Sequence, residues 1–111
     1  MKQKVLAFDI DGVICHTLGS DYKNSKPNKE AIEKINNLYD KGNKIIIFTA
    51  RFMGRTNNDY KKAYQLGYKF TLNQLQSWNL KFNELILGKP SFDLLIDDKA
   101  FNYDESWIEE I

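Results

Sequence analysis

The sequence has one cysteine, one histidine and two prolines among its 111 residues. A single cysteine excludes an internal disulfide, and the adjacent pair Cys15-His16 has no second ligand pair with which to form a zinc site. Cys15 is therefore expected to pack within a loop. Because no linker, repeat or low-complexity tract divides the chain, we expect one domain over residues 1–111.

Long apolar runs are also absent, as is an excess of charge of one sign. No stretch reaches the length of a membrane helix, and no signal-type apolar segment follows Met1-Lys2-Gln3-Lys4. The net charge of +1 gives no reason to expect a nucleic acid or an anionic membrane as partner. The apolar share of 42% is typical of a globular protein, and we expect it in the cytoplasm.

Four short apolar runs are typical of buried strands, and each is followed by polar residues. They are Val5–Phe8, Lys44–Phe48, Leu85–Leu87 and Asp93–Ile96. Helical patterns separate the runs, and strands that alternate with helices indicate an α/β protein. We therefore predict a Rossmann-like, doubly wound and mostly parallel sheet with helices on both faces.

The clearest helical pattern runs from Asn28 to about Lys41, with Asn28 as N-cap and Gly42 as terminator. Gly67 is expected to separate two later helices. Trp107 is expected to cover an apolar patch from a short C-terminal helix. The three later helices are predicted at residues 58–66, 72–78 and 104–111.

Acidic, hydroxyl and amine side chains follow the four predicted strands. The first strand ends in Asp9-Ile10-Asp11-Gly12, the second in Thr49, the third in Gly88-Lys89 and the fourth in Asp97-Asp98. Ligands bind at the carboxyl ends of the strands in open parallel sheets. Two acids one residue apart repel each other unless a cation lies between them. The pattern predicts a site for a phosphate or a metal.

These residues resemble the four motifs of the haloacid dehalogenase (HAD) superfamily of phosphatases and phosphotransferases. Asp9-Ile10-Asp11-Gly12-Val13 looks like the first motif, Thr49 the second, Lys89 the third and Asp97-Asp98 the fourth. The match runs from Asp9 to Asp98. The whole string is also similar to small bacterial HAD proteins associated with capsule or other surface-polysaccharide synthesis.

The resemblance implies that Asp9 is the nucleophile and forms an aspartyl-phosphate. Asp11 would protonate the leaving oxygen and then activate water, with a pKa raised by its acidic neighbours. Mg²⁺ is the implied cofactor, held by Asp9, the backbone carbonyl of Asp11 and Asp97. Asp98 would be a further ligand or would orient Asp97; spacing does not decide between the two acids, and we favour Asp97.

Phosphate binding is expected from a hydroxyl, an ammonium and backbone N–H groups near the strand ends. The predicted set is Gly12, Thr49, Ala50, Arg51 and Lys89. The alternative for Thr49 is an ordinary strand residue, and for Lys89 a solvated surface position. Arg51 and Arg55 are the two arginines, and both follow Thr49. Arg51 is expected to contact the substrate or to form a surface ion pair, and Arg55 is the weaker candidate.

The segments that could hold a cap domain are short. Residues 15–27 are too few for a helical cap, and residues 51–87 hold little beyond the helices that the sheet needs. An open site favours a large substrate or a homo-oligomer in which a neighbouring subunit shields it. The loop from Leu18 to Lys26 could act as a small mobile flap, and His16 could line the mouth.

Four functions are compatible with parts of this pattern. We favour a Mg²⁺-dependent phosphomonoesterase for a small sugar or polyol phosphate, connected with polysaccharide synthesis. The main alternative is a phosphatase for a nucleic-acid end or a phosphoprotein. A receiver-type phospho-acceptor module is disfavoured because Thr49-Ala50-Arg51 contains no acid. An inactive binding domain is disfavoured because no motif residue is missing.

Overall fold

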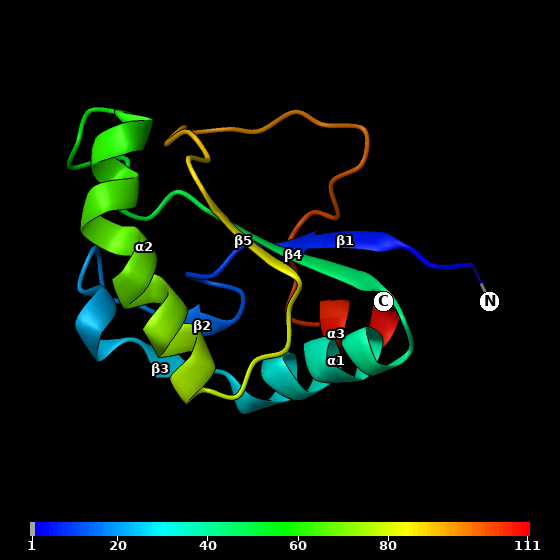
Figure 1. Cartoon of the computed structure of the whole chain (residues 1–111). Coiled ribbons are helices and arrows are strands. Elements are labelled where there is room, and N and C mark those ends of the chain that lie inside the picture. Colours follow the sequence, from blue (N-terminus) through cyan, green and yellow to red (C-terminus); the bar gives the residue numbers. More distant parts are fainter. Residues whose placement is uncertain (1) are drawn as a thin grey trace.

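A computed structural model of the chain describes residues 2–111. The elements are β1 (Val5–Phe8), β2 (Cys15–His16), the 3₁₀ helix η1 (Tyr22–Asn24), β3 (Lys26–Pro27), α1 (Lys29–Asp40), β4 (Lys44–Thr49), α2 (Tyr60–Ser77), β5 (Glu84–Leu87) and α3 (Trp107–Glu110), as Figure 1 shows. Strands and helices alternate along the chain, which confirms the predicted α/β class.

The main sheet has three parallel strands in the order β1-β4-β5. Phe8 lies opposite Ile47, and Thr49 lies opposite Leu87. This register brings the carboxyl ends of the three strands to the same edge of the sheet (Figure 1). Residues 9, 49 and 88 therefore leave the sheet close to one another.

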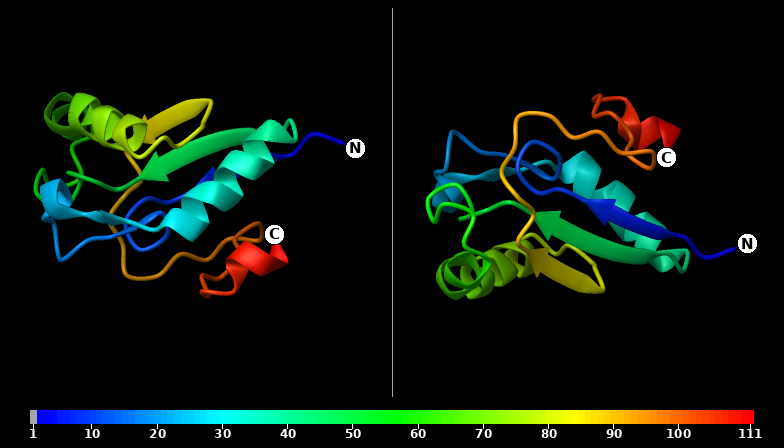
Figure 2. Two further views of the ribbon diagram at one scale, coloured as in Figure 1. Left: turned by 90° about the horizontal axis from the view of Figure 1, so that it is seen from below. Right: turned by 90° about the horizontal axis from the view of Figure 1, so that it is seen from above.

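The two faces of the sheet differ in burial. One face carries the fully buried Ile45 and Ile47, and α1 packs against it. The opposite face carries Val5, which is 63% exposed, and Ile86, which is 39% exposed. Figure 2, seen from above, shows the strands in front of α1 with no helix over them. Helices were predicted on both faces of the sheet, and in the structure they cover one face only.

The predicted strand at residues 93–96 does not form. Leu94, Leu95 and Ile96 are 77%, 50% and 90% exposed, and the chain from β5 to α3 has no regular element. In Figure 1 this orange segment bends away from the sheet before it reaches α3. A short apolar run looks the same in sequence whether or not a partner strand buries it, which explains the wrong prediction.

The prediction of two helices separated by Gly67 is also wrong, because α2 continues through this residue. The ring of Phe52 lies directly against Gly67, where any Cβ atom would collide with it. Glycine destabilises a helix interior by about 1 kcal/mol relative to alanine. Here Gly67 provides the space that the ring of Phe52 occupies, and α2 continues through it.

Both ends of the chain's clearest helical pattern agree with prediction. Asn28 caps α1 by accepting a hydrogen bond from the backbone N–H of Ala31, and Gly42 follows the helix with φ of 96°. At the C-terminus, the ring of Trp107 in α3 lies 5.4 Å from that of Phe8. The last helix therefore closes the core beside β1.

Residues 2–111 contain no cap domain. Between β1 and α1 the regular elements are a small ladder, in which Cys15 pairs with Pro27 and His16 with Lys26, and the one-turn helix η1. This ladder closes the base of the loop that was predicted to be a flap. None of the helices in this part of the chain combines the length and the apolar character needed to cross a bilayer.

Replacing Trp107 by alanine should lower the free energy of unfolding by about 3–5 kcal/mol, because the variant loses a buried aromatic ring and gains a cavity. Trp107 is 3% exposed. Urea-induced unfolding measures the change. The matched control is Phe101→Ala, at a ring 48% exposed, which should change stability by no more than about 0.5 kcal/mol. Equal effects of the two substitutions would contradict the docking of α3.

Candidate active site at the carboxyl edge of the sheet

Asp9, Thr49 and Lys89 lie together where β1, β4 and β5 end. The Nζ atom of Lys89 is 3.2 Å from Oδ2 of Asp9, although 80 positions separate the two residues. The backbone N–H of Lys89 donates to the carbonyl of Thr49 at 3.2 Å. The residues that follow three of the predicted strands therefore meet at one edge of the sheet.

Lys89 is directed to this place by the turn at Gly88. Gly88 has φ of 104°, a conformation that favours glycine. The ring of Tyr60, at the start of α2, lies against Gly88, and a Cβ atom there would come within 2.8 Å of Cε2 of Tyr60. The chain can therefore leave β5 sharply, and the next residue reaches Asp9.

The carboxylate of Asp9 is partly accessible. Its side chain is 35% exposed, whereas that of Lys89 is 18% exposed. Oδ1 of Asp9 accepts a hydrogen bond from the backbone N–H of Ile10 at 2.8 Å, and Oδ2 faces Lys89. An accessible carboxylate beside a cation can attract a phosphate group and attack it.

Asp11 has a different environment, because Arg51 grips it with two parallel hydrogen bonds. Nε of Arg51 is 2.8 Å from Oδ2 of Asp11, and Nη2 is 2.9 Å from Oδ1. Thr17 donates its hydroxyl to Oδ1 at 2.6 Å. The side chain of Arg51 is fully buried. The alternative of a surface ion pair is therefore wrong for Arg51, because this buried side chain pairs with the partly exposed carboxylate of Asp11, and a substrate contact of Arg51 stays a prediction.

The remaining donors of Arg51 connect two loops to α2. Nη1 donates to Oε1 of Gln74 at 2.6 Å, and Nη2 lies 3.5 Å from the hydroxyl of Ser25. Gln74 in turn donates to the carbonyl of Tyr22 at 2.7 Å, and the guanidinium lies 4.7 Å from the centre of the Tyr22 ring. The loop at 18–26, predicted to be a mobile flap, is thus fastened to the buried arginine.

The pKa of Asp11 lies below its usual value. Burial alone would raise it, but the hydrogen bonds and positive charge of Arg51, with the Thr17 and Cys15 contacts, outweigh burial. The sequence predicted a raised pKa from acidic neighbours, and this is wrong because the nearest charge is a cation. Burial raises the pKa of the Cys15 thiol, which packs in the loop as predicted.

The predicted Mg²⁺ ligands do not come together. Asp97 and Asp98 are exposed, and Oδ1 of Asp97 accepts from the backbone N–H of Lys99 at 2.9 Å. Asp9 faces Lys89 and Asp11 faces Arg51. Residues 2–111 include no cluster of three acidic, histidine or cysteine side chains able to hold a metal. In this arrangement the predicted ligand set does not fit the ion.

Three predicted phosphate-binding residues are used in the turns themselves. The hydroxyl of the buried Thr49 accepts from the backbone N–H of Arg51 at 3.0 Å. The N–H of Gly12 donates to the carbonyl of Cys15 at 2.8 Å, and the carbonyl of Ala50 accepts from Met53 at 3.0 Å. These bonds shape the loops after β1 and β4. Lys89 is the member of the predicted set that stands beside the accessible acid.

The two remaining candidates, His16 and Arg55, both lie at the surface. His16 is exposed in β2. Arg55 is also exposed, with its guanidinium carbon 4.6 Å from the centre of the Phe52 ring and one N–H donated to the carbonyl of Ser20 at 3.1 Å. Gln74 was not predicted as a site residue, because a glutamine within a helix gives no signal of the arginine it binds.

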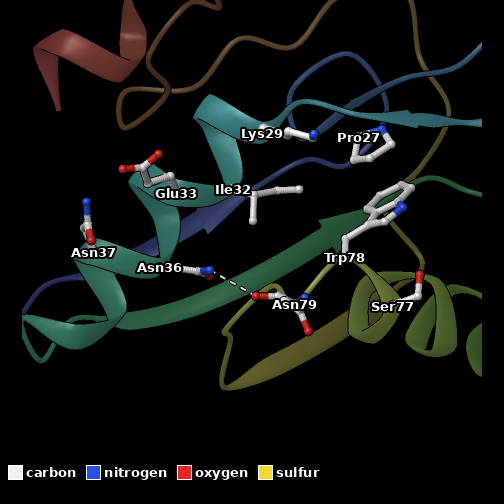
Figure 3. A pocket seen from close by; sticks show the side chains of 9 residues that line it. All are labelled: Pro27, Lys29, Ile32, Glu33, Asn36, Asn37, Ser77, Trp78 and Asn79. Carbon is white, nitrogen blue, oxygen red and sulfur yellow. Dashed lines mark hydrogen bonds between the residues drawn. The ribbon is translucent and has the colours of Figure 1, made fainter.

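A hollow of about 430 Å³ lies between α1 and the end of α2. Figure 3 shows Trp78 and Ile32 turned toward each other across it, whereas Glu33 and Asn37 point away. Asn36 spans this hollow by donating to the carbonyl of Asn79 and accepting from the N–H of Lys81. No predicted site residue lines the hollow, so we place the candidate site at the carboxyl edge.

Comparisons with known proteins support the fold. No protein-family model matches the chain, and no curated protein matches it. The crystal structure of a target protein from Vibrio cholerae is similar, with a TM-score of 0.82 and 26% sequence identity. The likeness covers 97% of this chain and 95% of that one. The same arrangement therefore occurs, over almost its whole length, in a crystallographically determined protein.

Breaking the Asp11–Arg51 pair should be costly. Arg51→Met should lower the free energy of unfolding by about 3 kcal/mol. This is the lower end of the range for breaking a buried ion pair, because the side chain of Asp11 is 27% exposed. The double variant with Asp11→Asn should lose less than the sum of the two single variants. Urea unfolding gives all three values. Asp40→Asn, at the exposed pair with Lys81, is the control and should cost less than about 1 kcal/mol. Strict additivity would contradict the pair.

The same pair predicts a pH dependence of stability. Because the folded-state pKa of Asp11 is lowered, its contribution is complete above the unfolded-state pKa of about 3.9 and is lost as pH falls through the folded value. The stability difference between the wild type and Asp11→Asn should therefore stay constant from about pH 7 to 5 and shrink below about pH 4. Unfolding measured across this range checks it; a difference that shrinks near pH 6 would contradict it.

Proposed function

We propose that this protein is a phosphomonoesterase of the HAD type that acts on a small phosphorylated metabolite, such as a sugar or polyol phosphate. The observation that supports this most is the approach of Lys89 to Asp9 at 3.2 Å, at an edge without a cap. The order of the motifs in the sequence adds to it. Asp9 is the proposed nucleophile.

In the first step, Oδ of Asp9 forms a bond to phosphorus while the bond from phosphorus to the alcohol oxygen breaks. The positive charge of Lys89 offsets the repulsion between the carboxylate and the phosphate dianion. Water then attacks the aspartyl-phosphate, which releases phosphate and restores Asp9. The alcohol oxygen must gain one proton and the attacking water must lose one.

Asp11 is the proposed group for these proton transfers. Its contact with Arg51 favours the ionised form, which suits acceptance of a proton from the attacking water. Donation to the leaving oxygen requires that the ion pair opens and that Asp11 binds a proton first. The proposal therefore requires one arrangement of Arg51 for each of the two roles of Asp11.

We propose a second arrangement of the chain, in which the sheet is doubly wound and the Mg²⁺ site is formed. Among the described residues no strand pairs with the outer edge of β1, and the apolar segment at 93–96 is exposed. We propose that this segment pairs with β1, which would carry Asp97 and Asp98 to the edge that holds Asp9. Burying an apolar side chain of this size contributes about 1.5–3 kcal/mol, a favourable term for this pairing.

The net charge of the protein and the open site bear on the class of substrate. A net charge of +1 favours small phosphate esters over nucleic-acid ends. Homo-oligomerisation, a cytoplasmic location and a part in polysaccharide synthesis stay predictions from the sequence. A macromolecular phosphate ester is the alternative substrate, because residues 2–111 contain no cap that would restrict access.

Asp9→Asn should reduce the turnover of p-nitrophenyl phosphate by about 10³-fold or more, because it removes the nucleophile without a change of shape. Its unfolding midpoint should stay close to that of the wild type. Asp40→Asn, an exposed acid elsewhere, serves as control and should retain full activity. Turnover unaffected by Asp9→Asn would refute the assignment. A panel of sugar, polyol, oligonucleotide and phosphopeptide esters then decides between the substrate classes.

Addition of Mg²⁺ should protect the backbone amides of residues 94–96 from hydrogen exchange, because pairing with β1 would engage them. The measurement does not depend on activity. Asp97→Asn should weaken this protection, whereas Asp93→Asn, at the other end of the segment, is the matched control. If Mg²⁺ leaves these amides unprotected, the second arrangement is wrong. Full activity in chelator would refute the cofactor.

A further inference from the structure

A second hollow, of about 370 Å³, lies between the loop after β2, the loop after β4 and α2. Aromatic and charged side chains line it together. Its lining consists of Ser20, Asp21, Tyr22, Lys23, Phe52, Arg55, Leu66 and Phe70. No motif of the sequence pointed to this combination.

The hollow has an aromatic wall formed by Tyr22, Phe52 and Phe70, and the backbone of Phe52 is strained. Phe52 has φ of 68°, which is rare for a bulky side chain and costs about 1–3 kcal/mol. Its ring is packed against Gly67, lies 5.0 Å from the ring of Tyr22 and meets the edge of Phe70 at 6.3 Å. Strained residues that the surroundings fix in this way are concentrated at ligand sites.

Arg55 stands over this wall, and within residues 2–111 its guanidinium donates one hydrogen bond. Its guanidinium carbon is 4.6 Å from the centre of the Phe52 ring and 5.4 Å from that of Tyr22. One N–H group donates to the carbonyl of Ser20. Within residues 2–111 no carboxylate forms a salt bridge with Arg55. Contact with two aromatic rings leaves the planar fork of N–H donors available to an oxyanion.

The local charge favours an anion as well. Lys23 and Arg55 are two cations of the lining, and neither has a carboxylate partner in the part of the chain described. Asp21 is the acidic member, and the amide of Asn24 binds both of its oxygens, at 2.9 and 3.2 Å. The hollow therefore keeps an excess of positive charge.

A chain of side-chain contacts connects the hollow with the candidate active site through Tyr22 and Arg51. Arg51, which binds Asp11, lies 4.7 Å from the centre of the Tyr22 ring, and Arg55 also lies over this ring. Two arginines thus share one aromatic ring. Each of the three guanidinium nitrogens of Arg51 donates a hydrogen bond, whereas within residues 2–111 Arg55, in the lining of the hollow, donates one, to Ser20.

We propose that this hollow binds a second anionic group, a carboxylate or a phosphate, on the alcohol portion of the substrate, with the guanidinium of Arg55 as its main partner. The inference rests on the proposed phosphomonoesterase function and narrows its substrates. They are phosphate esters of acidic alcohols or bisphosphates, rather than neutral sugar or polyol phosphates.

Matched substrate pairs test the proposal through their specificity constants, kcat/KM. Phosphoglycerate should be a better substrate than glycerol phosphate, or glucose bisphosphate a better one than glucose monophosphate; the pair that responds identifies carboxylate or phosphate. Arg55→Ala should reduce this preference by roughly 10-fold, as expected for loss of a charged hydrogen bond. Arg55→Lys should retain part of it. Lys62→Ala, an exposed cation outside the lining, should leave it unchanged.

A binding measurement separates failure of this proposal from failure of the proposed function. Malonate and inorganic phosphate are titrated into the protein, with malonamide as the neutral control, while NMR follows the ring protons of Tyr22 and Phe52. Shifts with either anion that Arg55→Ala abolishes support the hollow, even if no ester is hydrolysed. If hydrolysis occurs but Arg55→Ala changes neither the shifts nor the substrate preference, the proposal is overturned.

Discussion

The interaction on which the rest of the structure depends is the buried ion pair between Asp11 and Arg51. A fully buried guanidinium destabilises a protein unless a carboxylate and further acceptors satisfy it. Asp11 supplies the carboxylate, and Gln74 supplies an acceptor from α2. Three segments distant in sequence are thereby fixed to one another. The loops that surround the carboxyl edge of the sheet take their shape from this contact.

The ion pair also divides the charges near β1 between two environments. Asp9 and Asp11 are separated by one residue, yet each faces a different cation. Asp9 remains accessible beside Lys89, whereas Asp11 is held ionised beside a buried arginine. Carboxylates in such different surroundings suit different chemical roles. Because Arg51 is occupied in this way, Arg55 is the arginine that the proposed anionic group would meet.

Sequence patterns were reliable where local physics decides the outcome, and failed where packing decides it. The cap at Asn28 and the turn at Gly42 involve neighbouring residues, and both formed as predicted. Gly67 was expected to end a helix, but a ring from another loop packs against it. The apolar run at 93–96 was expected to be a strand, yet no partner strand buries it.

The sequence by itself determined the alternation of strands and helices and the residues that follow each strand, because hydrophobic periodicity and turn residues act over short distances. It also placed Asp9, Thr49 and Lys89 at one edge, since parallel strands align their carboxyl ends. Only the tertiary structure decided which acid meets which cation. Ion pairs between residues 40 or 80 positions apart depend on how loops pack, and spacing does not encode that.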